Sequence, residues 1–216
     1  MGYQIAIDGP ASSGKSTIAK LVAKQMNFTY INTGSMYRAI CHYILDNNLS
    51  LDNPKLEDII KTVEIDLDGD TVFMNGEDVS EVIRGHEVTN NVSEVSKVAF
   101  IRTILVKMQQ DIAAKKDVVM DGRDIGTVVL KEADLKIFMV ADVIERANRR
   151  YKDNLEKGIP TDFDRLVKEI EERDFIDSNR EISPLKQADD AILLDTTKMS
   201  INEVAEYIMN LIKVGG

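Results

Sequence analysis

The chain has 216 residues and a formal net charge of −10, with 44% apolar and 6% aromatic side chains. This length and composition are typical of one globular unit with room for a small appended subdomain, and they exclude a disordered or fibrous chain. The acidic balance argues against nucleic acid as a partner, because the overall field repels a phosphate backbone. A local cluster of arginines could still bind a small anion, since salt screens charges beyond about 10 Å.

Cysteine content and the first residues bear on the cellular compartment. The lone Cys41 cannot form an internal disulfide, and no group of Cys and His has the spacing of a zinc site. The opening stretch MGYQIAIDGP has no basic leader and no long apolar run, so we expect neither a signal peptide nor a membrane partner. A cytoplasmic location is the simplest expectation.

Residues 3–8 predict a short buried strand, and a glycine-rich loop follows that strand and opens a helix with apolar periodicity. The loop sequence GPASSGKS fits the phosphate-loop pattern G-x-x-x-x-G-K-[ST]. In such a loop the backbone N–H groups surround phosphate oxygens, Lys15 supplies positive charge beside the transferred phosphate, and the Ser16 hydroxyl can bind Mg²⁺. The alternative is a chance turn rich in Gly and Ser, which the strand before it and the helix after it disfavour.

A second strand-to-helix turn follows the apolar run FTYI, with Thr33 and Arg38 near the start of the helix. Residues 63–79 then alternate apolar and polar side chains and contain Asp-Gly and Asn-Gly turn signals. We therefore predict a small antiparallel sheet inserted in an α/β chain. From 87 to 116 the spacing predicts a long helical stretch, with a candidate break near 95–99.

The second half of the chain alternates buried strands with amphipathic helices. The predicted strands are DVVMD, LKIFMVA and AILLD, and the predicted helices span 142–158, 163–179 and 200–212. Ser200 and Glu203 have the spacing of a capping box at the start of the last helix. This alternation predicts a mostly parallel sheet covered on both faces, with ligands bound beyond the carboxyl ends of its strands.

Charged residues cluster in three places outside the phosphate loop. The stretch MDGRDIG places Asp121, Arg123 and Asp124 behind a strand, where a turn supported by its own charges is the structural alternative. Two predicted helices each carry three charged residues on one face. For both, the alternative to a binding site is a solvated face with ion pairs. The trios are Arg146, Arg149 and Arg150, then Arg173, Asp177 and Arg180. We favour a second phosphorylated ligand, because phosphoryl transfer between two anions requires neutralisation of charge.

Five segments taken in order, IAIDGPASSGKST, NTGSMYRA, MDGRDIGTVV, ERANRRY and ERDFIDSNREISPL, closely resemble the bacterial cytidylate kinases. These enzymes transfer the γ-phosphate of ATP to CMP and dCMP, and the match extends over nearly the whole chain. The resemblance implies a three-layer α/β P-loop kinase fold with a central parallel sheet. It also implies a core of residues 1–32 and 117–216, an NMP-binding subdomain of residues 33–116 with a small β insert near 63–84, and a short lid over 146–163.

The resemblance also assigns site residues. The implied ATP-binding residues are Gly9, Pro10, Ala11, Ser12, Ser13, Gly14, Lys15, Ser16 and Thr17. The implied CMP-binding residues are Thr33, Tyr37, Arg38, Ser93, Arg102, Arg123, Asp124, Arg173, Asp177 and Arg180. The implied catalytic residues are Lys15, Arg123, Arg149, Arg150 and Arg180.

Within the acceptor set, the resemblance implies three tasks. Ser93, Arg102 and Asp124 would contact cytosine, whose exocyclic amine suits a carboxylate and whose N3 and O2 suit a guanidinium. Arg173 and Asp177 would bind the sugar hydroxyls, and the remaining residues would surround the nucleotide and its phosphate. The role of Asp121 stays open between a water-mediated contact to Mg²⁺ and support of the turn.

ATP is the implied phosphate donor and Mg²⁺ the implied ion, bound by Ser16 together with phosphate oxygens and water. Small nucleotides are the implied partners, and we expect a monomer. Two alternatives stay open. One is a related kinase whose acceptor is UMP or AMP. The other is a nucleotide-dependent switch, which the missing guanine-binding tetrapeptide Asn-Lys-x-Asp disfavours.

Overall fold

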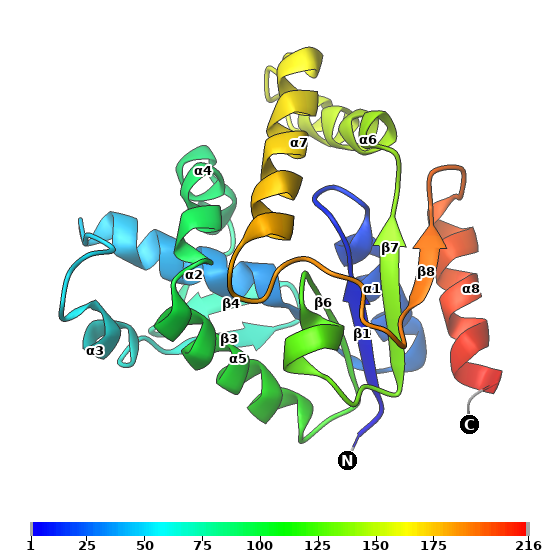
Figure 1. Cartoon of the computed structure of the whole chain (residues 1–216), viewed down its shortest axis with the longest axis horizontal. Helices are drawn as coiled ribbons and strands as arrows, with labels where there is room; N and C mark the ends of the chain where they lie inside the picture. Colours follow the sequence, from blue (N-terminus) through cyan, green and yellow to red (C-terminus); the bar gives the residue numbers. More distant parts are fainter. Residues whose placement is uncertain (1, 215–216) are drawn as a thin grey trace.

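A five-stranded parallel sheet forms the centre of the molecule (Figure 1). The computed structural model of the chain describes residues 2–214, with side chains through residue 212. The strand order is β2-β6-β1-β7-β8. The strands are β1 (Gln4–Asp8), β2 (Thr29–Asn32), β6 (Val118–Gly122), β7 (Leu135–Val140) and β8 (Ile192–Asp195). The parallel sheet predicted from the alternation of strands and helices is confirmed.

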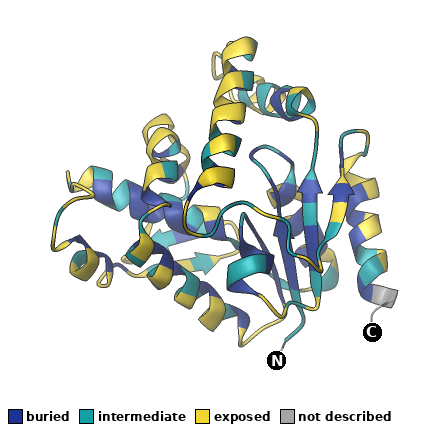
Figure 2. Cartoon of the chain, in the orientation of Figure 1, coloured by how far each residue is buried: buried dark blue, intermediate teal, exposed yellow. Residues whose placement is uncertain are grey.

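Helices cover both faces of this sheet. One face packs against α1 (Lys15–Met26) and α8 (Ile201–Val214), and the other against α5 (Ala99–Ala113) and a short π-helix, η2 (Ile125–Val129). Successive side chains of β1 divide between the layers, because a strand alternates its faces. Ile5 and Ile7 enter the core with α1 and α8, whereas Ala6 enters the core with η2. Figure 2 shows β1 and β6 as the buried centre of the sheet, whereas β8 at its edge is partly exposed.

A second unit lies beside the core and has its own apolar cluster. Its elements are α2 (Thr33–Asp46), α3 (Leu56–Ile60), β3 (Ile65–Asp68), β4 (Thr71–Met74), β5 (Glu77–Asp78), η1 (Val82–Arg84) and α4 (His86–Val95). The cluster joins Met36 and Ile40 of α2 to Val88 of α4 and Leu105 of α5. The small antiparallel sheet is confirmed as β3-β4-β5, and the helical stretch breaks between Val95 and Ala99 as expected.

Helices α6 (Val143–Glu156) and α7 (Phe163–Asn179) pack against each other beyond the carboxyl ends of the strands (Figure 1). Their contact is apolar and includes Ala147, Leu166 and Ile170. Each helix begins at an aspartate whose side chain accepts a backbone N–H, from Ile144 at 2.8 Å and from Arg165 at 2.8 Å. These caps satisfy donors that have no partner inside a helix, which fixes where both helices begin.

The capping box of α8 is confirmed, because Ser200 N donates to Glu203 at 2.8 Å and Glu203 N donates to Ser200 at 3.3 Å. The π-helix η2 was not predicted, since the sequence suggested only a turn after β6. Within residues 2–214, no helix is both long and apolar enough to cross a bilayer.

Candidate active site

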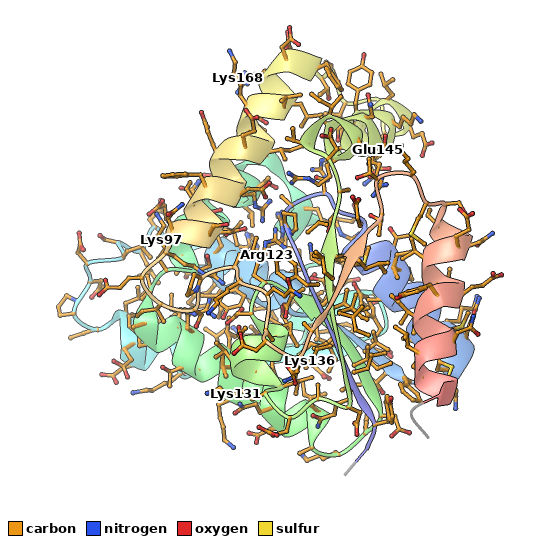
Figure 3. The ribbon with its side chains drawn as sticks, turned by 45° about the vertical axis from the view of Figure 1, so that its right-hand side comes forward. Lys97, Arg123, Lys131, Lys136, Glu145 and Lys168 are labelled. Carbon is orange, nitrogen blue, oxygen red and sulfur yellow. The ribbon has the colours of Figure 1, made fainter. Side chains whose placement is uncertain are left out.

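A cavity of about 1020 Å³ opens at the carboxyl edge of the sheet, between the phosphate loop, α2, α4, α6 and α7. It is lined by every sequence-predicted site residue except Gly9 and Pro10. Figure 3 shows Arg123 near the middle of the molecule below α7, with Glu145 on α6 and Lys168 toward the far end of α7. The predicted residues therefore meet at this edge, although they come from the phosphate loop, α2, α4, α5, the turn after β6, α6 and the end of α7.

Gly9 and Pro10 shape the phosphate loop instead of lining the cavity. A Cβ at Gly9 would stand 2.0 Å from the carbonyl oxygen of Met139, so only glycine lets the loop leave β1 beside β7. The Pro10 carbonyl accepts a bond of 2.6 Å from Lys15 Nζ. Both residues thus act on the loop's shape.

Lys15 folds back across the phosphate loop. Its Nζ lies 2.6 Å from the Pro10 carbonyl and 3.3 Å from Ser13 Oγ. Burial lowers the pKa of Lys15 well below its ordinary value, and the positive charge of Arg123 lowers it further. A buried ammonium with carbonyl and hydroxyl partners gains from an incoming anion, so the loop is arranged for phosphate before any ligand arrives.

The loop serine is bonded to the β6 carboxylate whose role the sequence left open. Ser16 Oγ donates to Asp121 at 2.8 Å, and the Tyr30 hydroxyl donates to the other oxygen of Asp121 at 2.9 Å. Asn32 donates to the Tyr30 hydroxyl at 3.0 Å and caps α2 through Ser35 N. Burial raises the pKa of Asp121. Sequence reasoning missed Tyr30 and Asn32, although both lie at the carboxyl end of a strand beside the loop.

These residues suit Mg²⁺ that arrives with phosphate. The described residues contain no group of three or more His, Cys, Asp and Glu side chains able to bind a metal on their own. Ser16 and Asp121 offer one hydroxyl and one carboxylate, side by side at the phosphate loop. Mg²⁺ keeps several waters and takes few protein ligands when phosphates supply the rest, so this donor set fits the ion.

Asp124 is buried between two arginines. Arg102 Nη2 bonds one carboxylate oxygen, and Arg180 Nη2 lies 3.5 Å from the other. The Arg102 guanidinium also stacks over the Tyr37 ring at 5.4 Å. Burial raises the pKa of Asp124 even though both arginines oppose the shift. A carboxylate and a guanidinium therefore stand together at one wall of the cavity.

The other acceptor-side arginines form a positive cluster. Arg123 Nε donates to Asp177 at 2.7 Å, and Arg38 donates to the Ile83 carbonyl at 3.1 Å and to Thr89 at 2.9 Å. The buried Nε of Arg173 has no hydrogen-bond partner among the described residues. Burial, followed by the charge of neighbouring arginines, lowers the pKa of both Arg38 and Arg173 to about 10.

Arg146 does not share the position of Arg149 and Arg150. Its Nη1 donates to the Ala11 carbonyl at 2.9 Å and pairs with Asp174 at 2.5 Å. Asp174 in turn accepts the Ala11 N–H at 3.0 Å, so both backbone groups of Ala11 are bonded by side chains of α6 and α7. The predicted basic face of α6 is therefore divided, because Arg149 and Arg150 line the cavity and Arg146 faces the loop backbone.

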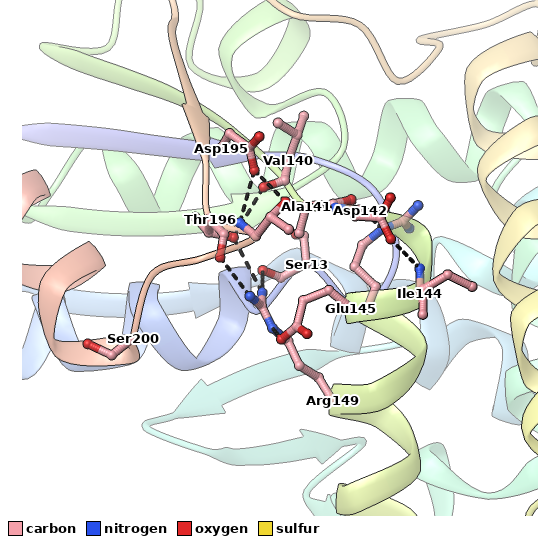
Figure 4. A network of polar contacts seen from close by, with 12 residues as sticks. Ser13, Val140, Ala141, Asp142, Ile144, Glu145, Arg149, Asp195, Thr196 and Ser200 are labelled. Atoms are coloured by element: carbon pink, nitrogen blue, oxygen red, sulfur yellow. Dashed lines mark hydrogen bonds and ion pairs between the residues drawn. The ribbon is translucent and has the colours of Figure 1, made fainter.

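Arg149 joins three parts of the site (Figure 4). Its guanidinium donates to the Ser13 carbonyl at 3.1 Å, to the Thr196 carbonyl at 2.7 Å and to Glu145 at 3.0 Å. Five residues that follow β8 also line the cavity, and none was in the predicted set. They are Thr196, Met199, Ser200, Ile201 and Val204. Their place after the carboxyl end of a parallel strand was the available signal.

The chain is similar to known cytidylate kinases over nearly its whole length. The family model described as cytidylate kinase matches residues 5–214. A cytidylate kinase of Leuconostoc mesenteroides is 52% identical, covering 98% of this chain and 96% of that protein. A cytidylate kinase of Bacillus cytotoxicus is 51% identical, covering 96% and 95%.

Solved structures with low sequence identity share the fold alone. An uncharacterised protein of Eubacterium ventriosum has a TM-score of 0.56 at 13% identity, covering 99% of both chains. A gluconokinase of Sinorhizobium meliloti has a TM-score of 0.50 at 11% identity, covering 99% of this chain and 93% of its own. These likenesses agree with the α/β architecture, and the family follows from the full-length match. The chain belongs to the cytidylate kinase family.

Proposed function

We propose that this protein transfers the γ-phosphate of ATP to CMP or dCMP, giving ADP with CDP or dCDP. The observation that carries the proposal is one cavity in which a phosphate loop faces a buried pair, Asp124 and Arg102. Cytosine presents an amine donor beside two acceptors, which a carboxylate and a guanidinium match. Uracil presents a carbonyl where cytosine has the amine, and that carbonyl would face the Asp124 carboxylate.

On the donor side, the loop from Gly9 to Thr17 binds the ATP phosphates: Gly9 and Pro10 set its shape, and backbone N–H groups of the cavity-lining residues meet the phosphate oxygens. Lys15 neutralises the migrating phosphoryl group. Ser16 and Asp121 would hold Mg²⁺ against the phosphates. When bound, the ion neutralises charge that develops on the phosphate oxygens. Arg149 and Arg150 approach the phosphates from α6.

On the acceptor side, Arg123 and Asp177 are paired with each other in the structure, and in the proposed function each of them contacts the substrate instead. The CMP phosphate replaces Asp177 as the partner of Arg123, with Arg38 and Arg180 completing the clamp. Asp177 is then free to accept a sugar hydroxyl together with Arg173. Ser93, Arg102 and Asp124 contact the cytosine, while Thr33 and Tyr37 pack around the nucleotide.

Catalysis in this proposal is positioning and charge neutralisation, with no covalent intermediate. The core comprises residues 1–32 and 117–216, and residues 33–116 form the NMP-binding subdomain with its β insert near 63–84. Residues 146–163 act as a lid that excludes water, which would otherwise compete with CMP for the phosphoryl group. The protein works as a monomer in the cytoplasm.

A coupled assay with four acceptors tests the proposal. We expect CMP and dCMP to be phosphorylated at rates far above UMP and AMP when ATP and Mg²⁺ are supplied. Removal of Mg²⁺ with a chelator should stop turnover. Preference for UMP or AMP would replace the acceptor assignment, and hydrolysis of ATP without transfer to any acceptor would contradict the kinase proposal.

Lys15→Ala tests the donor site. We expect transfer to fall by at least about 10³-fold, because the transition state loses its fixed positive charge. The fold should persist, since the variant removes a buried charge that burial disfavours. Circular dichroism checks the fold and the coupled assay checks turnover, with the exposed Lys97→Ala as the matched control. Wild-type turnover in Lys15→Ala would refute the donor-site assignment.

A further inference from the structure

Asp8, the last residue of β1, carries a buried carboxylate that neither substrate contacts in the proposed function. Its side chain is only 4% exposed, and it does not line the cavity. One oxygen accepts the backbone N–H of Ile125 at 2.8 Å, and the other accepts the N–H of Gly126 at 2.7 Å. Both amides belong to the first turn of η2, where N–H groups have no partner inside the helix.

The two amides come directly after Asp124 in the chain. Asp8 and Gly122 are paired neighbours in the sheet, so the β1 carboxylate spans the turn from the end of β6 to the start of η2. Arg123 and Asp124 lie within that spanned turn. Their backbone is therefore fixed at one end by the β-ladder and at the other by the Asp8 carboxylate.

We infer that Asp8 is a positioning residue for recognition of the acceptor base. Its carboxylate holds the 122–126 turn so that Asp124 stays at the position where it meets the cytosine amine. This inference rests on the proposed function, because it assigns the means by which that base contact is oriented. Groups that orient a binding side chain commonly change affinity as much as the binding group itself.

The space around Asp8 leaves little room for another arrangement. A Cβ on Gly126 would lie 3.4 Å from the Asp8 carboxylate and 3.2 Å from the stem of Lys136. The charged groups that face Asp8 are Lys15 from the phosphate loop and Asp124 from the turn, while the Lys136 ammonium is paired with Asp190. The two backbone N–H donors of the turn therefore meet a single carboxylate that has little room to move.

Asp8→Asn removes one of the two acceptor oxygens and keeps the size of the side chain. Its amide can accept one N–H, and its own NH₂ then faces the other N–H without bonding it. We expect the ratio of the UMP and CMP dissociation constants, which measures base selectivity, to fall by about tenfold or more. The affinity for a non-hydrolysable ATP analogue should change much less. Asp52→Asn, an exposed aspartate in a distant loop, is the matched control.

Calorimetric binding of CMP, UMP and the ATP analogue measures these quantities without relying on turnover. Because CMP and UMP carry the same phosphate, their ratio cancels the titration of that group. An unchanged ratio in a folded Asp8→Asn protein overturns the inference, as does an equal loss of affinity for all three ligands. Wild-type protein that does not prefer CMP to UMP would instead count against the proposed function.

If Asp8→Asn does not fold, a measurement on the wild-type protein tests the positioning role of Asp8 instead. Protonation of Asp8 removes the same acceptor as the substitution, and burial raises the pKa of this carboxyl to about 6. The selectivity ratio should therefore fall as pH drops through the titration of Asp8, followed by the ¹³C shift of its carboxyl carbon. A ratio that stays constant through that titration, or that follows the carboxyl of Asp124 instead, overturns the inference.

Discussion

At the carboxyl edge of the parallel sheet, buried carboxylates are paired with arginines, and the arginines outnumber them, which suits an anion. Asp124 faces Arg102 and Arg180, and Asp177 faces Arg123. Removing one member of such a set exposes the other to an uncompensated desolvation cost, which exceeds the net gain from the pair itself. Substitutions at these positions consequently affect stability as well as recognition, and conservative amides separate the two effects better than alanine.

Asp124→Asn is the sharper test of base recognition. The amide keeps the shape of the side chain but turns one acceptor into a donor, which faces the cytosine amine. We expect kcat/KM for CMP to fall by about 30-fold to 100-fold, a loss of about 2–3 kcal/mol, and the value for UMP to fall far less. The acceptor assay measures both. Equal losses for CMP and UMP would separate Asp124 from base recognition.

Because the pKa of Asp8 is raised by burial, we expect the free energy of unfolding to depend on pH. Its pKa is about 6 in the folded protein and 3.8 in its ordinary state, so folding favours the protonated carboxyl. Asp8 therefore costs stability above pH 6, and that cost disappears as pH falls toward 4. The melting temperature of wild type relative to Asp8→Asn should rise between pH 7.5 and pH 5, where the stability difference changes by about 1.5 kcal/mol of a total of roughly 3 kcal/mol that is approached only near pH 4. Parallel melting curves for the two proteins across this range would contradict the shift.

At the scale of elements, side chains of α6 and α7 fasten the phosphate loop. Arg146 and Asp174 bond the carbonyl and the N–H of Ala11, and Arg149 bonds the Ser13 carbonyl. The same turn of α7 that carries Asp174 also carries Arg173 and Asp177, which line the acceptor part of the cavity. The position of α7 is thus connected to both nucleotide sites through adjacent residues.

Arg146→Lys tests this fastening. Lysine keeps the charge but lacks the planar fork that serves Ala11, Ala141 and Asp174 together. We expect the dissociation constant of an ATP analogue to rise by about tenfold, with a lower melting temperature. Arg165→Lys, whose arginine forms an exposed pair on α7, should leave both unchanged. Normal ATP binding in Arg146→Lys would mean that the loop keeps its shape without α6.

The sequence predicted most helices and strands, but it did not predict which side chains of different elements contact one another. Apolar periodicity predicted α7 at its observed bounds, because a helix with one buried face carries that signal locally. The π-helix escaped prediction, since it depends on the Asp8 carboxylate, which lies far away in the sequence. Spacing also placed Arg146 on one face with Arg149 and Arg150, but only the docking of α6 onto the loop decides that Arg146 turns toward Ala11.

For the molecule as a whole, an acidic chain surrounds a concentrated positive cavity. The net charge is −10, yet the phosphate loop lysine and seven of the arginines line one cleft. Burial, followed by the charges of Arg123 and Arg150, lowers the pKa of Arg38 and of Arg173. Anion binding should relieve this repulsion and stabilise the fold.

Inorganic phosphate should therefore raise the melting temperature by about 2–5 °C at millimolar concentration, whereas sodium chloride of equal ionic strength should not. Arg173→Gln should reduce the phosphate effect, because it removes a guanidinium whose buried Nε has no hydrogen-bond partner within the described part of the chain. Arg165→Gln is the matched control on the exposed side of α7. An equal shift with chloride would indicate general screening instead of a site. Differential scanning fluorimetry measures all of these shifts.

The central place of β1 has a consequence for synthesis of the chain on the ribosome. Its two neighbours in the sheet are β6 and β7, which begin at Val118 and Leu135. A nascent chain grows at about 5–20 residues per second, so β1 and its glycine loop wait for many seconds without either neighbour. The phosphate loop can meet the turn after β6 only once β6 has been made, and the cavity is complete only after α6, α7 and residues 196–204 have followed. A chain released before β6 is complete lacks the sheet that positions its phosphate loop.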